Sequence, residues 1–241
     1  MSVRLWGAAA PVSGVLAILR KDVRAEWRSR ERLSPMVFFV LLILLVFNFS
    51  FELGGAALHE IGPGVLWSAF VFAGLFGLNQ TFTSELDNRC LDALVLAPVS
   101  GGGLYAAKML GNLLFLLVTE LLCLPFFGLF FNLSPGLYLL PLLLVFTLGA
   151  ASLASVGTLF AAMSSNSRLR EFLLPLLVLP MIVPALISAV QATTVIFEQT
   201  QLGADALLWP AALATHVRML AVYSVVFTAL SAMLFDQVLE D

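Results

Sequence analysis

Six apolar runs, each about 20 residues long, constrain the fold of this chain more than any other feature. A helix of that length spans the hydrocarbon core of a bilayer and satisfies its own backbone hydrogen bonds there. The composition agrees, with 61% hydrophobic and 11% charged residues against ~45–50% and ~25% in ordinary soluble domains. So little charge excludes a soluble domain, a disordered chain and a nucleic-acid binder. The sequence therefore predicts an all-α integral membrane protein, with six transmembrane helices at roughly 34–53, 64–84, 106–131, 137–163, 172–192 and 217–235.

The charges between the runs predict how the chain crosses the membrane. Eleven of the 12 Lys and Arg residues lie before the first run or in the second and fourth breaks, and only Arg218 lies on the other side. Because basic residues favour the cytoplasmic side, both termini are expected there. The chain then divides into a cytoplasmic N-terminal segment, 1–33, a six-helix transmembrane domain, 34–235, and a cytoplasmic tail, 236–241. The break at 193–216 is expected to be a short helix or loop on the outer face.

The N-terminal segment has the pattern of a basic amphipathic helix. Apolar residues recur at helical spacing and basic residues occupy the opposite face; they are Val15, Leu16, Leu19, Val23 and Trp27, and Arg20, Lys21, Arg24 and Arg28. Such a helix lies along the headgroup boundary of a bilayer. Two interpretations are open: an anchor on membrane lipid, or a lever between the membrane and a cytoplasmic partner.

A short charged helix is predicted at 85–97, after the second run. Ser84 is a suitable N-cap, Glu85 and Asp87 suit the positive end of the helix dipole, and three glycines at 101–103 follow the segment. A short, half-apolar helix fits a groove of another protein. The residues expected to dock there are Glu85, Leu86, Asp87, Arg89, Leu91, Asp92 and Leu94. The alternative is an ordinary solvated helix in a loop.

Three prolines interrupt the fifth run. Pro175, Pro180 and Pro184 each remove a backbone donor and oppose a straight helix. In lipid, the carbonyls that they release need partners from neighbouring helices or water. We therefore expect a kinked helix packed against protein, which acts either as a static bend or as a hinge.

Glu120 is the only acidic residue deep within a run. Intramembrane acids usually face the interior of the bundle or a cavity. Thr119, Thr147 and Ser152 are candidate partners at the same depth, and none of them is basic. Glu120 is therefore expected to be protonated or paired with another chain, in a structural, pathway or interface role. Small residues in the fourth run favour close packing within the subunit, and a homodimer is also compatible with them.

The sequence offers no site for chemistry. The stretch Gly102–Met109 resembles a phosphate-binding loop, but Ala107 replaces the second glycine and Met109 the hydroxyl residue. Cys90 and Cys123 form no metal-ligand spacing, and no catalytic arrangement is visible. We expect no catalysis, no metal site and no cofactor bound by this chain.

Several stretches resemble the haem exporter protein B family, the permease subunit of the ABC transporter of cytochrome c maturation. They are Gly62–Trp67, the acidic segment Phe82–Leu94 with the following Lys108, and the proline-rich Leu176–Ile187. The resemblance implies a permease in the bacterial inner membrane, with haem as a potential substrate. It also implies three partners: an ABC ATPase subunit that binds ATP and contacts 85–97, a haem-handling membrane subunit and a periplasmic haem chaperone.

Two alternatives stay open beside this resemblance. The same six-span plan serves permeases for a lipid, a drug or a polysaccharide. A non-transporting scaffold of a multi-subunit membrane complex would share the composition too. The word haem comes from the resemblance alone, because fold does not imply function.

Overall fold

The computed structural model describes residues 12–50, 56–87, 101–131, 139–165, 167, 169–201 and 210–238, with backbone alone at a few helix ends. These residues form seven helices and no strand. The helices are α1 (Val12–Ser29), α2 (Leu33–Ser50), α3 (Ala56–Asp87), α5 (Gly101–Phe130), α6 (Leu139–Ser164), α7 (Arg170–Gln201) and α8 (Ala211–Val238). All except α1 are long and apolar enough to span a membrane. The predicted all-α fold with six spans and an N-terminal amphipathic helix is confirmed.

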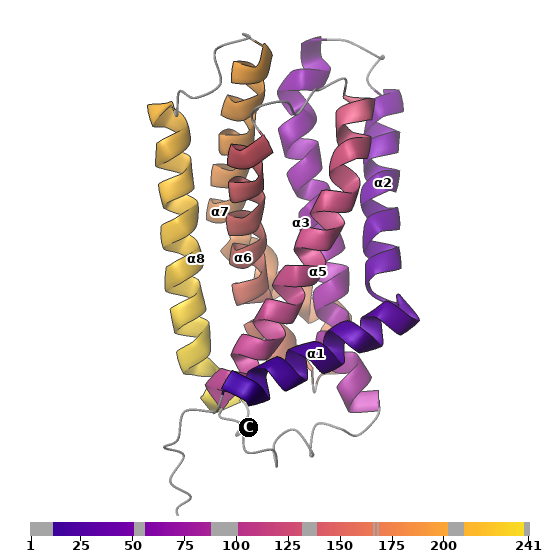
Figure 1. The fold of residues 1–241 in the computed structure, drawn as a ribbon, viewed down its shortest axis with the longest axis vertical. Coiled ribbons are helices and arrows are strands. Elements are labelled where there is room, and N and C mark those ends of the chain that lie inside the picture. Colours follow the sequence, from indigo (N-terminus) through magenta and orange to yellow (C-terminus); the bar gives the residue numbers. More distant parts are fainter. Residues whose placement is uncertain are drawn as a thin grey trace, which may run out of the picture.

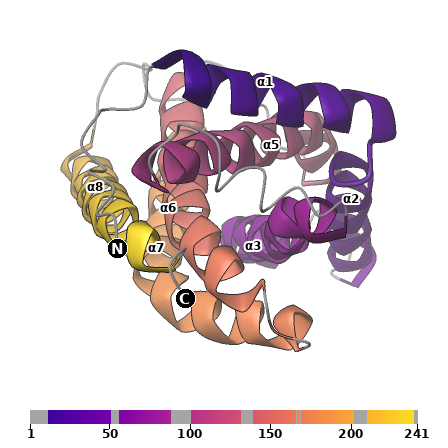
Figure 2. The same cartoon turned by 90° about the horizontal axis from the view of Figure 1, so that it is seen from below.

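The six long helices run alternately up and down, and α1 lies across one end of them (Figure 1). We call this end of the bundle the α1 end. Seen along the bundle, α1 passes beside α5 and leads into α2 (Figure 2). Helix α6 is central, since it packs against α3, α5, α7 and α8.

Small residues let α6 approach α3 closely. A Cβ atom on Gly149 would lie 2.2 Å from the ring of Trp67, and one on Gly157 would lie 2.3 Å from the side chain of Leu78. Ala154 of α6 is fully buried. The small-residue face predicted for the fourth run is therefore used for packing inside this chain.

Three predicted boundaries are wrong. Helix α3 begins eight residues early and contains Pro63, and α5 begins at Gly101, five residues early, so the three glycines form the start of this span. Helix α7 continues to Gln201, into the segment that was expected to be a separate short helix or loop on the outer face. Tertiary packing explains part of this, because Gly62 lies against the rings of Phe127 and Phe131. Such contacts outweigh the weak local preference of glycine and proline against a helix.

The two outermost spans present apolar side chains on the surface. Helix α2 exposes Phe38 and Phe49, and α8 exposes Val225 and Met233, each by more than two thirds. An exposed apolar surface of this extent is what a bilayer covers. The chain is a multi-pass membrane protein.

Candidate functional site

Helix α1 is fastened to the bundle by a buried ion pair. The ammonium of Lys108, on α5, lies 2.9 Å from a carboxylate oxygen of Asp22, and the Lys108 side chain is only 1% exposed. The same ammonium lies 5.8 Å from the ring centre of Phe82, on α3, a cation–π distance. Lys108 lies in the second turn of α5, where Asp22 compensates its buried charge. Three helices therefore meet at one charged group.

Only part of α1 faces solvent or lipid. Ile18 and Glu26 are buried against the bundle, whereas Leu16 and Trp27 are 57% and 79% exposed. The basic residues Arg20 and Arg24 are exposed too. The bundle therefore takes the acidic and part of the apolar side of α1, and leaves a surface that is both basic and apolar.

The joint between α1 and α2 is held by a carboxylate. Glu26 accepts hydrogen bonds from the backbone N–H groups of Arg32, at 2.9 Å, and Leu33, at 2.8 Å. These groups lie at the N-terminus of α2, where donors lack partners within the helix and a negative charge is favourable. Arg30, in the turn, adopts a left-handed φ of 55°. Glu26 thus fixes the direction in which α2 leaves α1.

Arg32 connects this joint to α3 and α5. Its guanidinium donates hydrogen bonds to the carbonyls of Gln80, at 3.0 Å, and Thr81, at 3.3 Å. It also lies 5.6 Å from the ring centre of Phe115 on α5. The α1–α2 joint is therefore attached to the last turns of α3.

A buried polar ladder crosses the bundle just inside these contacts. The hydroxyl of Thr81 donates to the side-chain carbonyl of Asn112 at 2.9 Å, and the Asn112 amide donates to the hydroxyl of Thr158 at 2.9 Å. The ladder joins α3, α5 and α6. Sequence reasoning missed it, although a lone Asn within an apolar run is a usable signal.

The predicted docking residues divide into two groups. Glu85, Leu86 and Asp87 form the last turn of α3, at the α1 end. The sequence pattern predicts that Ser84 caps the start of a separate helix. This prediction is wrong, because Ser84 lies within α3. The remaining docking residues lie outside the described residues; they are Arg89, Leu91, Asp92 and Leu94. The start of the docking segment is thus continuous with a membrane span.

In the middle of the bundle, Trp67 connects α3 to α7. Its indole N–H donates to the hydroxyl of Thr193 at 2.9 Å, and both side chains are buried. The ring meets Phe70 and Phe146 edge to face, at 6.0 and 5.7 Å between ring centres. Gly149 gives the ring its space. This hydrogen bond is a side-chain connection between two spans at a level where lipid offers no alternative partner.

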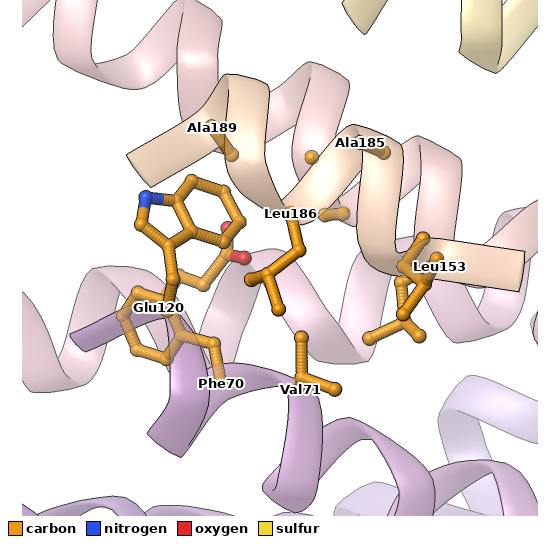
Figure 3. A pocket seen from close by; sticks show the side chains of 11 residues that line it. Phe70, Val71, Glu120, Leu153, Ala185, Leu186 and Ala189 are labelled. Carbon is orange, nitrogen blue, oxygen red and sulfur yellow. The ribbon is translucent and has the colours of Figure 1, made fainter. Parts of the chain in front are cut away.

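Glu120 points into a small cavity between α3, α5, α6 and α7 (Figure 3). The side chain is 2% exposed, and its Oε2 is the one buried side-chain atom, among those the structure describes, that lacks a hydrogen-bond partner. The candidate partners Thr119, Thr147 and Ser152 each donate to the carbonyl four residues earlier in their own helix. Burial within this chain also leaves no surface for pairing with another chain.

The prolines of α7 do not break the helix. Pro175, Pro180 and Pro184 lie inside one continuous helix, and Pro180 and Pro184 are exposed on its surface, where we expected contact with protein. The hydroxyl of Tyr223, on α8, donates to the carbonyl of Met181. That carbonyl lies in the turn before Pro184, so a neighbouring helix contacts α7 at its proline-rich segment.

These contacts hold helices together and do not suggest a reaction. Across the ranges that the structure describes, no three His, Cys, Asp or Glu side chains are grouped so that they could hold a metal ion. The arrangement can transmit a displacement from the α1 end into the spans, through charged and polar contacts that join α1, α2, α3 and α5.

Comparison with known proteins matches residues 13–235 to a family model described as "CcmB protein". Similar curated proteins are named "Heme exporter protein B". The protein from Paracoccus denitrificans is 32% identical over 176 residues, which is 73% of this chain and 80% of the relative. The protein from Pseudomonas aeruginosa is 32% identical over 171 residues, covering 70% and 76%. The protein from Rhodobacter capsulatus is 29% identical, covering 71% and 78%.

Proposed function

This chain belongs to the CcmB protein family, and on that basis we propose that it is a membrane permease subunit for haem export in the biogenesis of c-type cytochromes. The match over residues 13–235 carries the proposal, because it includes nearly all of α1 and all six candidate spans. Two relatives named "Heme exporter protein B" are each 32% identical over at least 70% of this chain.

ATP hydrolysis belongs to a separate ABC ATPase subunit in this proposal. The docking contact is the segment 85–97, which begins with the last turn of α3. The α1 end then faces the cytoplasm of a bacterial cell, and the spans lie in its inner membrane. In the sequence, eleven of the 12 basic residues precede the first apolar run or lie in the second and fourth breaks, which supports this orientation through the positive-inside rule.

The contacts at the α1 end suggest how force would travel. A push on Glu85–Asp87 enters α3 directly, because these residues belong to that helix. Arg32 hydrogen-bonds the α3 backbone only one turn away, so the α1–α2 joint follows the same displacement. Lys108 conveys it to α5. This supports the lever interpretation of the N-terminal helix.

Haem itself is assigned to the partners of this chain, a haem-handling membrane subunit and a periplasmic haem chaperone. The cavity at Glu120 measures about 10 Å³, which is close to the space that the centre of one water molecule needs. A porphyrin does not fit in this cavity. In this proposal, the chain supplies movement that acts on haem held elsewhere in the complex.

The test is co-purification of the ATPase subunit with tagged chain. Charge reversal at Asp87→Lys or Asp92→Lys, or a charge at Leu94→Glu, should remove the ATPase from the complex and abolish holocytochrome c formation. Glu198→Lys is the matched control, because Glu198 is an exposed acidic residue near the C-terminal end of α7, away from the segment 85–97. Retention of ATPase and of holocytochrome formation in all three variants would contradict docking at 85–97. Normal holocytochrome formation without the ATPase would favour the scaffold alternative.

A further inference from the structure

Glu120 poses a physical problem that the proposed function does not solve. Its carboxyl group is 2% exposed, it lies within a membrane span, and Oε2 has no hydrogen-bond partner among the described residues. A buried polar atom without a hydrogen-bond partner keeps the full cost of its removal from water. The other residues that line the cavity are aromatic, aliphatic or small, so none of them brings a positive charge to Glu120.

The size and lining of the cavity decide which ligand it suits. Its volume of about 10 Å³ admits one water-sized molecule and no organic group. Ca²⁺ and Mg²⁺ take about six or more oxygen ligands and Zn²⁺ about four ligands, whereas the lining side chains offer a single carboxyl group. Four lining residues are small, which brings helix backbone close to the cavity; they are Gly149, Ala150, Ala185 and Ala189. A helical carbonyl retains a second lone pair that can accept a hydrogen bond.

We propose that this cavity is a binding site for a single water molecule, which hydrogen-bonds Glu120 Oε2 and the backbone of α6 or α7, and that the Trp67–Thr193 hydrogen bond closes the site. The water supplies the missing partner of Oε2. The carboxyl group is neutral in this site, since an isolated carboxylate in an apolar interior carries a far larger cost.

The closing contact follows from the walls of the cavity. Trp67 of α3 and Ile182, Ala185 and Ala189 of α7 all line the cavity. Figure 3 shows Ala185 and Ala189 on the same helix. The indole N–H of Trp67 holds Thr193, one turn further along α7, at 2.9 Å. Water therefore enters or leaves when α7 moves away from α3, and that movement breaks this hydrogen bond.

Infrared spectroscopy of the full chain in lipid nanodiscs tests both parts. The difference between wild type and Glu120→Gln isolates the C=O band of Glu120. We expect a neutral carboxyl band at the frequency of a hydrogen-bonded group. Filling the cavity with Ala185→Val should move the band to the higher frequency of a free carboxyl, and Ala162→Val, outside the lining, should leave it in place. A free-carboxyl band in the wild type, a carboxylate band, or no response to Ala185→Val would overturn the water site.

The rate of hydrogen–deuterium exchange of the same band tests the closure. Thr193→Val keeps the shape of the side chain and removes the acceptor of the Trp67 bond, so exchange should become about fivefold faster, the factor that corresponds to a hydrogen bond of ~1 kcal/mol. Thr194→Val is the matched control, because its hydroxyl bonds only the carbonyl of Val190 in its own helix. Equal rates in both variants would refute the closure. If Ala185→Val does not fold, a high-resolution map of the wild type decides: density about 2.5–3.0 Å from Oε2 supports the site, and its absence refutes it.

Discussion

The ion pair between Asp22 and Lys108 gives a prediction that separates buried from exposed electrostatics within one cluster. Asp22 contacts two lysines: Lys108 at 2.9 Å, with 1% of its side chain exposed, and Lys21 at 3.3 Å, with 52% exposed. Removing one partner of a buried pair costs about 3–5 kcal/mol, because the other charge stays buried. An exposed pair contributes about 0–1 kcal/mol. The same carboxylate therefore takes part in two contacts of very different value.

Asp22→Asn should lower the free energy of unfolding by about 3–5 kcal/mol, since the Lys108 ammonium keeps its burial and loses the negative charge beside it. Lys21→Met should change it by no more than about 1 kcal/mol. The double variant Asp22→Leu with Lys108→Met should lie close to wild type, because apolar replacement of a buried pair is often neutral. Titration with a denaturing detergent, followed by circular dichroism, measures all three. Equal small losses for Asp22→Asn and Lys21→Met would refute the buried-pair reasoning.

Three further predictions concern the interior. Gly149→Ala places a Cβ atom 2.2 Å from the Trp67 ring, so it should destabilise the protein by about 1–3 kcal/mol, whereas Gly64→Ala, with no atom within 4 Å, should be neutral or slightly stabilising in thermal unfolding. Asn112→Leu breaks both bonds of the ladder and should cost about 1–3 kcal/mol, and an unchanged melting temperature would show that the ladder carries no net stability. Tyr223→Phe removes a donor to the α7 backbone and should speed amide exchange around the proline turn; unchanged exchange would contradict its supporting role.

The number and class of the elements could be predicted from the sequence because lipid imposes a simple rule on composition. Apolar composition predicts the ends of the helices poorly, because the helices can continue past the point where the chain leaves the hydrocarbon. Pro63 indicates a break by local preference but lies inside α3, and the glycines at 101–103 form the first turn of α5. Their penalties of about 1–3 kcal/mol are within what a long packed helix can offset.

The candidate site was predictable only where one residue is unusual by itself. Glu120 stood out as an acid within an apolar run, and it does face a cavity. The pairing of Asp22 with Lys108 could not be found, because 86 residues separate them and only the packing of α1 on α5 brings them together. The prolines of α7 were expected to pack against other helices. The proline ring is apolar and has no N–H group, however, so it can face lipid without burying an unsatisfied polar group. Pro180 and Pro184 do so.

The carboxylate of Glu26 has a mechanical consequence. Glu26, on α1, hydrogen-bonds the backbone at the start of α2, so it restrains the angle between α1, which lies across the end of the bundle, and α2, which runs along it (Figure 1). The turn at Arg30 is too short to absorb a sideways push. If α1 acts as the proposed lever, we expect a push on it to tilt α2, because the guanidinium of Arg32 also links this joint to the backbone of α3. In that proposal, Glu26 couples movement of α1 along the membrane surface to tilting of α2 across the membrane.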